Sequence, residues 1–375
     1  MEFAFWAAFT FVAYTYLGYP LLIWVGASLR RATPVHTTAS DWLPDVRVVI
    51  AVHNEERRVA SKVRNLLAQD YPPERVHIVF VCDGCTDRTE AVLRECGGVE
   101  VLVSPVRRGK PNALNLAMSQ AHESVIVFTD VRQEVVPGAI RALVERLNES
   151  DVGAVSGELV HRETGSAQSA HIGLYWRYEK AIRKGESRLF STVGATGALY
   201  AMRREHVAAI REDTLLDDVE IPIRVLRKGL RIVLEERAVI WDDVETEIEG
   251  EFRRKVRTLA GNVQLAIRNG WLFVPWKCPV VFQFVSHKVC RLLVPYALVV
   301  AFVTAWASDG ALYRWLAVAQ TGAYALAAVG SVSTRLRSLP LVSVLVVFAQ
   351  LNAAAVVALV NYARGAASVQ WRKAA

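Results

Sequence analysis

Four carboxylates stand at positions where they could do chemistry. Asp130 ends the apolar run 125–129, and Asp83 ends a second apolar run. Asp217 and Asp218 form an adjacent pair later in the chain. Short apolar runs of this kind are typical of strands buried on both faces, and α/β sheets bind ligands beyond the carboxyl ends of such strands. A carboxylate placed there can bind a metal ion or accept a proton from a hydroxyl group.

Basic residues that could hold an anion occur at two places. Residues 107–110 (RRGK) precede a predicted helix, and cations beside a helix N-terminus form an anion site. A solvated basic loop is the alternative for that run. Arg254 and Arg257 lie three residues apart on a predicted helix over 251–269, so both guanidinium groups share a face and can clamp a phosphate. The alternative for this helix is a basic face against lipid headgroups.

The elements that position these residues alternate between strand and helix. Strands are predicted over 46–52, 76–82, 99–103 and 125–129, and helices over 56–68, 86–95, 110–120 and 137–148. This alternation indicates right-handed βαβ units and a parallel sheet covered by helices. Beyond Val152 the alternation decays. A further helix over 165–186 is both aromatic and basic, and it either packs on the domain or lies at the membrane surface.

The turns after the first two strands carry different information. Residues 53–56 read HNEE without a glycine, which argues against a dinucleotide-binding turn and an NAD enzyme. After the second strand, Gly84 permits a tight turn, and Thr86 or Asp87 can cap the next helix. Asp83 could accept hydrogen bonds from the base or ribose of a nucleotide. A purely structural turn is the alternative.

Apolar residues make up 53% of the 375 residues and are concentrated at the two ends. Residues 3–29 carry no charge and can cross the roughly 30 Å apolar core of a bilayer. Arg30 and Arg31 follow, which predicts that this end is cytoplasmic and the N-terminus outside. Further apolar runs cover 292–307, 315–334 and 339–363. In this orientation the tail from Arg364 would lie outside.

The overall charge limits the class of partner, and the cysteines indicate the redox compartment. A net charge of +7 would fit nucleic acid, anionic lipid or a phosphorylated substrate. The membrane helices favour lipid headgroups and phosphates, so no nucleic acid is expected. Among five cysteines, Cys82 and Cys85 form a CxxC without a second pair. Reduced thiols of a cytoplasmic domain are therefore expected rather than a zinc site.

Six motifs occur in a specific order along the chain. They are VHNE (52–55), CDGCTD (82–87), RRGKPNALNLA (107–117), FTDVRQEVVP (128–137), LLDDVEIPIRVLRKGLRIV (215–233) and FRRKVRTLAGN (252–262). In order and rough spacing they resemble membrane-embedded family 2 glycosyltransferases, which include cellulose, chitin, hyaluronan and poly-N-acetylglucosamine synthases. The resemblance covers Val46 to Asn269. Each motif is weak alone, but the ordered set is specific.

The resemblance implies an α/β GT-A fold, a Rossmann-like nucleotide-diphospho-sugar transferase domain flanked by transmembrane helices. The implied division is an N-terminal transmembrane helix (1–31), a linker (32–45), a cytosolic GT-A domain ending in a basic interfacial helix (46–270), an interfacial segment (271–291), three transmembrane helices (292–363) and a tail (364–375). The chain is thus expected to be a multi-pass plasma (inner) membrane protein whose active site faces the cytosol.

Site residues follow from the resemblance, motif by motif. Asp83 looks like the aspartate that contacts the nucleoside, and Asp130 like the first aspartate of DxD, which binds Mg²⁺ or Mn²⁺ and the diphosphate. Asp218 looks like the general base, with Asp217 beside it. The implied donor-binding set is Asn54, Glu55, Asp83, Lys110, Asp130, Arg132, Arg254 and Arg257. The implied acceptor loop is Gly194, Ala195, Thr196 and Gly197.

Two residues depart from the family pattern. Arg132 stands where DxD has its second aspartate, so a metal would have one protein ligand fewer and Arg132 could contact phosphate instead. Thr258 stands where the QxxRW motif has its tryptophan. In processive synthases that tryptophan helps to wall the acceptor site, so its loss speaks against long-chain processivity.

The predicted function is inverting transfer of a sugar from a nucleotide donor, expected to be UDP-linked, to a growing polysaccharide or a lipid-linked acceptor. Three C-terminal helices leave little protein to line a channel, which favours short products or a partner subunit. One alternative is a non-processive lipid glycosyltransferase similar to ceramide glucosyltransferases. The other is a catalytically degenerate nucleotide-sugar-binding membrane protein, which Arg132 and Thr258 suggest and the intact Asp217–Asp218 pair opposes.

Overall fold

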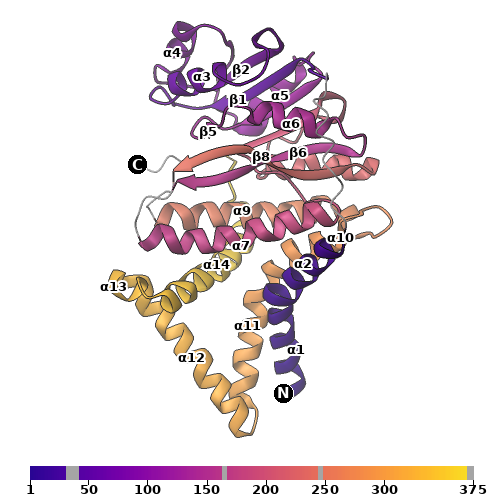
Figure 1. The fold of residues 1–375 in the computed structure, drawn as a ribbon. Helices are drawn as coiled ribbons and strands as arrows, with labels where there is room; N and C mark the ends of the chain where they lie inside the picture. Colours follow the sequence, from indigo (N-terminus) through magenta and orange to yellow (C-terminus); the bar gives the residue numbers. More distant parts are fainter. Residues whose placement is uncertain (31–41, 163–166, 244–247, 370–375) are drawn as a thin grey trace.

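A computed structural model describes residues 1–30, 42–162, 167–243 and 248–369. Most of the linker predicted over 32–45 and the end of the tail predicted over 364–375 lie outside these ranges. A domain built on a β-sheet lies at one end of the molecule, and a bundle of apolar helices that contains the N-terminus lies at the other (Figure 1). Two long helices separate them.

One mixed sheet forms the core of the domain. Its eight strands are β1 (Val46–Val52), β2 (Val76–Asp83), β3 (Glu100–Ser104), β4 (Val125–Thr129), β5 (Glu134–Val135), β6 (Val152–Arg162), β7 (Leu199–Arg203) and β8 (Arg231–Asp243), in the order β3-β2-β1-β4-β7-β6-β8-β5. The first four in this order run parallel. The carboxyl ends of β2 and β4 therefore bring Asp83 and Asp130 to the same edge.

Helices cover both faces of the parallel half. They are α3 (Val59–Leu67), α4 (Thr89–Cys96) and α5 (Lys110–Ser119). Helix α6 (Ala139–Leu147) packs instead on β6, β7 and β8. Because side chains alternate along a strand, Val48 and Ile50 of β1 pack in the core on the α3 face. Val49 and Ala51 pack in the opposite core with α5. This double burial explains the unbroken apolar runs in the sequence.

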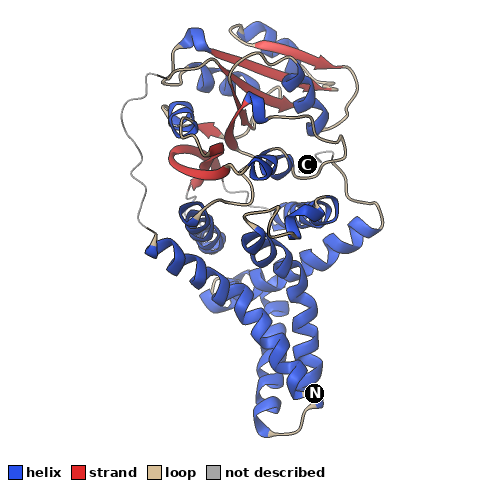
Figure 2. Ribbon diagram, turned by 90° about the vertical axis from the view of Figure 1, so that its right-hand side faces the viewer, coloured by secondary structure: helices blue, strands red, loops and turns tan. Residues whose placement is uncertain are grey.

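The second half of the sheet lies over two long helices, α7 (Ala167–Leu189) and α9 (Ile248–Arg268) (Figures 1 and 2). Helix α7 packs against β8 on one side and against the N-terminal apolar helix on the other. It therefore packs on the domain and also adjoins the apolar helices. The short helix α8 (Asp217–Glu220) and a 3₁₀ segment (Pro222–Lys228) precede β8.

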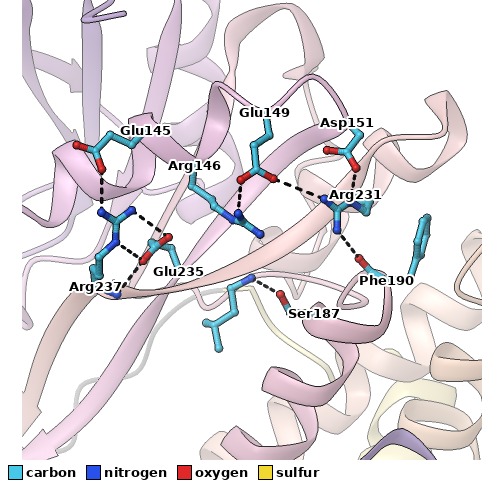
Figure 3. A network of polar contacts seen from close by, with 10 residues as sticks. Glu145, Arg146, Glu149, Asp151, Ser187, Phe190, Arg231, Glu235 and Arg237 are labelled. Atoms are coloured by element: carbon cyan, nitrogen blue, oxygen red, sulfur yellow. Dashed lines mark hydrogen bonds and ion pairs between the residues drawn. The ribbon is translucent and has the colours of Figure 1, made fainter. Parts of the chain in front are cut away.

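Ion pairs and hydrogen bonds hold β8 beside α6 and α7 (Figure 3). Arg237 bonds to Glu145 of α6 and to Glu235 of its own strand. Arg231 pairs with Asp151 at 2.7 Å, and Ser187 of α7 accepts a hydrogen bond from the backbone of Leu234. These contacts stabilise a charged stretch as a strand.

Four helical stretches are long and apolar enough to cross a membrane by length and composition. The first joins α1 (Glu2–Ala13), a π turn (Tyr14–Gly18) and α2 (Tyr19–Leu29). The second joins α10 (Val281–Gln283), a π turn (Phe284–Val289) and α11 (Cys290–Ala307), so it begins before the predicted start at 292. The others are α12 (Ala311–Val332) and, after the short α13 (Thr334–Arg337), α14 (Pro340–Ala363).

The chain after α14 returns to the domain. Helix α14 packs along α9, and Ala367 and Val369 pack against Leu215 and Ala260 of the domain. Val369 also lies against Gly109, the residue before α5. The prediction that the tail from Arg364 lies on the far side of the membrane is therefore wrong for its described part. Because α14 follows the underside of the domain, it carries the tail back to it.

Candidate active site

Lys110 links the carboxylates that follow β4 and begin α8. Its Nζ lies 2.9 Å from Oδ1 of Asp130 and 3.1 Å from Oδ2 of Asp217. Burial opposes the charged form of Lys110, but Asp130, Asp217 and Asp218 outweigh it and raise the pKa of the ammonium above its ordinary value. Lys110 therefore stays a cation between residues that are far apart in the sequence.

Asp83 shapes the loop that delivers Lys110. Its buried carboxylate accepts hydrogen bonds from the backbone N–H groups of Arg108, at 2.8 Å, and Gly109, at 2.7 Å. Gly84 has φ +59°, and a Cβ there would lie 2.4 Å from the backbone nitrogen of Arg107. The turn after β2 thus touches the loop before α5. A contact between Asp83 and a nucleoside stays a prediction.

Asn54 and Glu55 connect the turns after β1 and β2. Asn54 adopts a left-handed conformation with φ 55°, and its side-chain oxygen accepts the N–H of Thr86 at 2.7 Å. The backbone N–H of Glu55 donates to Thr89 Oγ1 at 2.7 Å, and the Glu55 carboxylate pairs with Arg58. Both residues support this edge of the sheet, and their predicted donor contacts stay predictions.

A cavity of about 450 Å³ opens beside these carboxylates. Asp130, Arg132, Asp218 and Arg254 line it together with the predicted acceptor loop Gly194–Gly197. Tyr16, Leu351 and Ala355 of the apolar helices line it as well. The cavity is thus continuous from the ends of the strands to the membrane helices.

Asp218 has the properties of a proton acceptor. Burial, followed by the negative charge of Asp217, raises the pKa of Asp218 to about 6. A carboxylate with a pKa near neutrality is an efficient general base. The predicted acceptor loop approaches Asp218 closely. The N–H of Ala195 donates to the backbone oxygen of Asp218 at 3.0 Å, and a Cβ at Gly197 would lie 3.1 Å from Asp218 Oδ2.

Arg132 is paired with a residue that the sequence analysis missed. Its Nη2 lies 2.6 Å from Oδ2 of Asp242, which is buried at the end of β8. Antiparallel pairing of Glu134 with Trp241 sets this register. Asp242 follows an apolar run, the same signal that marked Asp130, so the pattern could have indicated it. Both Arg132 and Asp242 line the cavity.

The two arginines of α9 have different surroundings. Arg254 and Thr258 line the cavity. Arg257 instead donates from Nη2 to the backbone oxygen of Leu215, 3.4 Å away, beside the Asp217–Asp218 pair. Thus Arg254 faces the cavity directly and Arg257 supports the segment that carries the pair. Their predicted contacts with a diphosphate stay predictions.

Lys62 of α3 supports the end of β4 from behind. Its buried ammonium donates to Thr129 Oγ1 at 3.2 Å and to the backbone oxygen of Gln133 at 2.8 Å. Burial lowers the pKa of Lys62 to about 7. In the sequence Lys62 stands on the same helical face as Val59 and Leu66, and a cation on an apolar face is the signal that could have identified it.

The residues around Asp130 fit a metal ion that is shared with a substrate. The Asp130 side chain is 34% exposed, and Lys110 engages its Oδ1. Within the described ranges, no group of three or more His, Cys, Asp or Glu residues could hold an ion by itself. Mg²⁺ is commonly held by one or two carboxylates together with substrate phosphates and water. Asp130 could supply such a carboxylate.

A family model described as glycosyl transferase family 2 matches residues 47–211. The chain contains a glycosyltransferase family 2 domain. This stretch holds Asp83, Asp130, Lys110 and the predicted acceptor loop, whereas the Asp217–Asp218 pair and Arg254 lie beyond it.

Curated relatives of this glycosyltransferase domain include proteins with lipid and polysaccharide products in their names. The chain is 26% identical over 239 residues to the probable glycosyltransferase YdaM of Bacillus subtilis. The aligned residues cover 60% of this chain and 57% of YdaM. It is 26% identical to the beta-monoglucosyldiacylglycerol synthase of Synechocystis, over 53% of this chain and 44% of the synthase. It is 23% identical to the poly-beta-1,6-N-acetyl-D-glucosamine synthase of Staphylococcus aureus, over 61% and 57%. The chain spans about half the length of these relatives.

A solved structure confirms the fold. The mannosyltransferase PcManGT from Pyrobaculum calidifontis, in complex with GDP-Man and Mn²⁺, superposes with a TM-score of 0.72. The match covers 96% of this chain and 99% of that one at 23% sequence identity. The predicted GT-A fold with flanking apolar helices is therefore confirmed.

Proposed function

We propose that this protein is an inverting glycosyltransferase that moves a sugar from a nucleotide-diphospho-sugar to a hydroxyl group of a lipid-linked acceptor or a growing glycan. One observation carries the proposal: a single cavity holds Asp218 and is also lined by residues of the membrane helices. An acceptor can therefore reach the base from the bilayer. The relatives named for a glycolipid and a polysaccharide support this acceptor class.

The donor diphosphate lies beside Asp130 in this proposal, with Lys110 and Arg254 as its cations. Mg²⁺ or Mn²⁺, held by Asp130 and the phosphates, would offset the negative charge of the leaving diphosphate. The solved relative binds GDP-Man and Mn²⁺, which supports the donor class. The sequence favours a UDP-linked donor, whereas that relative was solved with GDP-Man, and the panel of nucleotide sugars used below distinguishes the two nucleotides.

Asp218 performs the proton transfer. The acceptor oxygen forms a bond to the anomeric carbon as the bond from that carbon to the diphosphate breaks, and the hydroxyl proton passes to the Asp218 carboxylate. Attack opposite the leaving group inverts the anomeric configuration. Asp217 and Lys110 position the base, since Asp217 adjoins it and binds Lys110 at 3.1 Å.

Orientation follows from charge. Arg30 and Arg337 flank apolar helices, and basic residues favour the cytoplasmic side of a membrane. We therefore propose that the domain faces the cytosol of a multi-pass protein of the inner membrane.

The test uses the full chain in nanodiscs with a panel of nucleotide sugars and a membrane lipid extract. Nucleotide release and a glycosylated product are the readouts. D218N should lower turnover by on the order of 10²–10⁴-fold, as expected for loss of a general base. D213N is the matched control, because Asp213 is exposed and pairs with Arg268 away from the cavity. If D218N turned over substrate at the wild-type rate, Asp218 would not be the general base.

Product length separates the remaining alternatives. One added sugar per lipid identifies a single-addition enzyme, and a ladder on a gel identifies a polymerase. Thr258 at the cavity wall, where the processive synthases have tryptophan, favours the short product. Donor binding without turnover for any acceptor would identify the degenerate binding protein.

A further inference from the structure

A second group of charged residues lines the cavity where α7 meets the membrane helices. Glu179 and Glu186 of α7 flank His287, whose Nε2 lies 3.1 Å from Glu179 and whose Nδ1 lies 2.6 Å from Glu186. Arg291 also pairs with Glu179, and the Tyr19 hydroxyl donates to Glu186. Each carboxylate therefore has its partners within the protein.

These carboxylates are ionised. Burial would raise the pKa of Glu179, but Arg291 and His287 outweigh it and hold that pKa well below its usual range. Burial likewise opposes ionisation of Glu186, and the contacts with His287 and Tyr19 lower its pKa. Their direct contacts are with His287, Arg291 and Tyr19, and they attract Arg183 and Lys288 only at longer range.

Two further cations line the same cavity. Arg183 of α7 donates to Ser156 Oγ at 3.0 Å, and no carboxylate within the described residues lies within 4 Å of it. Lys288 has no hydrogen bond, and no ion pair within 4 Å, in the described part of the chain. At longer range both interact electrostatically with Glu186 and Glu179 and also with Asp218. Neither cation has a carboxylate in direct contact among the described residues, so an anion that entered the cavity could form charge-assisted hydrogen bonds with both.

The backbone that presents Lys288 is unusual. The π turn Phe284–Val289 interrupts one apolar helix, and the π turn Tyr14–Gly18 interrupts another. Tyr14 of one turn shares a 2.6 Å hydrogen bond with Ser286 of the other. Single π turns inside α-helices occur frequently at functional sites. Here they fix His287 and Lys288 toward the protein and the cavity.

We propose that Arg183 and Lys288 bind the phosphate group of a lipid acceptor, whose accepting hydroxyl then lies at Asp218. This inference rests on the proposed function and names the acceptor class, a phosphate-bearing lipid. A guanidinium group can bind two phosphate oxygens at once, and an ammonium can bind a third. The donor diphosphate has its own cations in Lys110 and Arg254, which belong to other helices.

The walls around this pair favour a lipid over a free anion. Tyr16, Leu351 and Ala355 bring membrane helices to the same cavity, so an acyl chain can stay in the bilayer while the headgroup enters. Gly185, two residues from Arg183, fits closely against Ile23 of α2, since a Cβ there would lie 2.6 Å from its Cγ2. The α7 helix is thus held at the membrane helix that borders the entrance.

The experiment measures the dissociation constant of a short-chain phosphatidic acid for the full chain in neutral detergent. The corresponding diacylglycerol, which lacks the phosphate, and inorganic phosphate are the comparison ligands. We expect phosphatidic acid to bind at least tenfold more tightly than either. R183Q and K288Q should each weaken its binding about tenfold while leaving the affinity for diacylglycerol unchanged.

K184Q is the matched control, because Lys184 neighbours Arg183 on α7 but pairs with Glu236 and does not line the cavity. It should bind phosphatidic acid like the wild type. K288R keeps the charge and should restore most of the affinity. Thermal unfolding identifies any variant that fails to fold, and such a variant is replaced by R183M or K288M.

Three results would overturn the inference. They are equal binding of phosphatidic acid by wild type and K288Q, equal binding of diacylglycerol and phosphatidic acid, and inorganic phosphate binding as tightly as the lipid. Nucleotide-sugar turnover is measured separately on the same samples. Loss of lipid selectivity with turnover retained refutes this site alone, and selective binding without turnover for any donor refutes the proposed function.

Discussion

The guanidinium group of Arg132 lies 2.6 Å from the buried carboxylate of Asp242, on a strand more than a hundred residues away. Arg132 stands two residues after Asp130, where the family resemblance of the sequence predicts the second aspartate of DxD. Asp242 neutralises the cation and places a carboxylate at the cavity wall from a different strand. The local charge at this wall therefore depends on the pair, and the motif alone does not reveal it.

Removing Arg132 from this pair should destabilise the protein more than removing the charge of Asp242. In R132A the Asp242 carboxylate stays buried with Gln133 as its remaining partner, 3.3 Å away, and we expect a loss of about 3 kcal/mol. In D242N the partly exposed Arg132 can reach water, so we expect about 1 kcal/mol. Thermal unfolding of the full chain in detergent measures both.

The double variant R132L/D242L serves as the control, because replacing both charges by apolar groups leaves neither one unpaired. It should be more stable than R132A. If D242N lost more stability than R132A, Asp242 would not be the buried residue that needs its partner to stay ionised.

The same position should control metal dependence. R132D removes a cation and adds a carboxylate between Asp130 and Asp242, and divalent metals with oxygen ligands gain affinity from added carboxylates. We expect the Mn²⁺ concentration for half-maximal turnover to fall about tenfold. R132Q, which removes the cation without adding a carboxylate, is the comparison. Equal metal requirements in R132D and R132Q would exclude a carboxylate contribution at this position.

The fall of kcat/KM at low pH should follow the protonation of Asp218. Its pKa is raised to about 6, first by burial and then by Asp217, and the base must be unprotonated to accept a proton. We expect kcat/KM to fall about tenfold per pH unit below pH 6. In D217N the negative charge beside Asp218 is gone, so its pKa is lower and the fall of kcat/KM should move to lower pH.

A pH profile of kcat/KM from pH 4.5 to 8 checks this, with D213N as the unshifted control. The same raised pKa has a stability consequence, because the folded state binds this proton more tightly than the unfolded state. Asp218 thus favours folding at low pH, and that contribution is lost as the pH rises from about 4 through about 6. If the fall of kcat/KM in D217N moved to higher pH, the charge of Asp217 would not be what raises the pKa of Asp218.

Sequence patterns predicted the parallel half of the fold well and the second half less well. Strand β1 occupies the predicted residues 46–52, because burial on both faces leaves an unbroken apolar run. Strand β8 lies beyond residue 152, where the strand–helix alternation decays, and it runs from Arg231 to Asp243. Its charged stretch is stable as a strand because Glu145 pairs with Arg237, a tertiary contact that no local pattern shows.

The candidate site shows the same division. The motifs identified Asp130 and Asp218, which line one cavity. They did not identify Glu186 or Lys288, because a buried charge has meaning only beside its partner. Glu179, Arg183 and Glu186 do share one face of α7 at spacings of four and three. That stripe was visible in the sequence, but its function depends on the π turn that faces it.

Gly109 should be essential to the placement of Lys110. It has φ +96°, its N–H donates to Asp83, and a Cβ would lie 3.2 Å from Val369 Cγ2 of the returning tail. G109A therefore adds backbone strain on the order of 1–2 kcal/mol and also displaces the tail or the loop. We expect the donor KM to rise about tenfold, because Lys110 is the next residue.

G97A separates these two effects. Gly97 also has a positive φ, of +67°, but nothing lies within 4 Å of a Cβ there, so the substitution adds strain without a collision. It should lower the unfolding temperature slightly and leave the donor KM unchanged. Because Val369 belongs to the tail, removing the chain after residue 363 should relieve the collision in G109A and recover part of the donor affinity. A donor KM in G109A that equals that of G97A would show that the tail does not bear on the Lys110 loop.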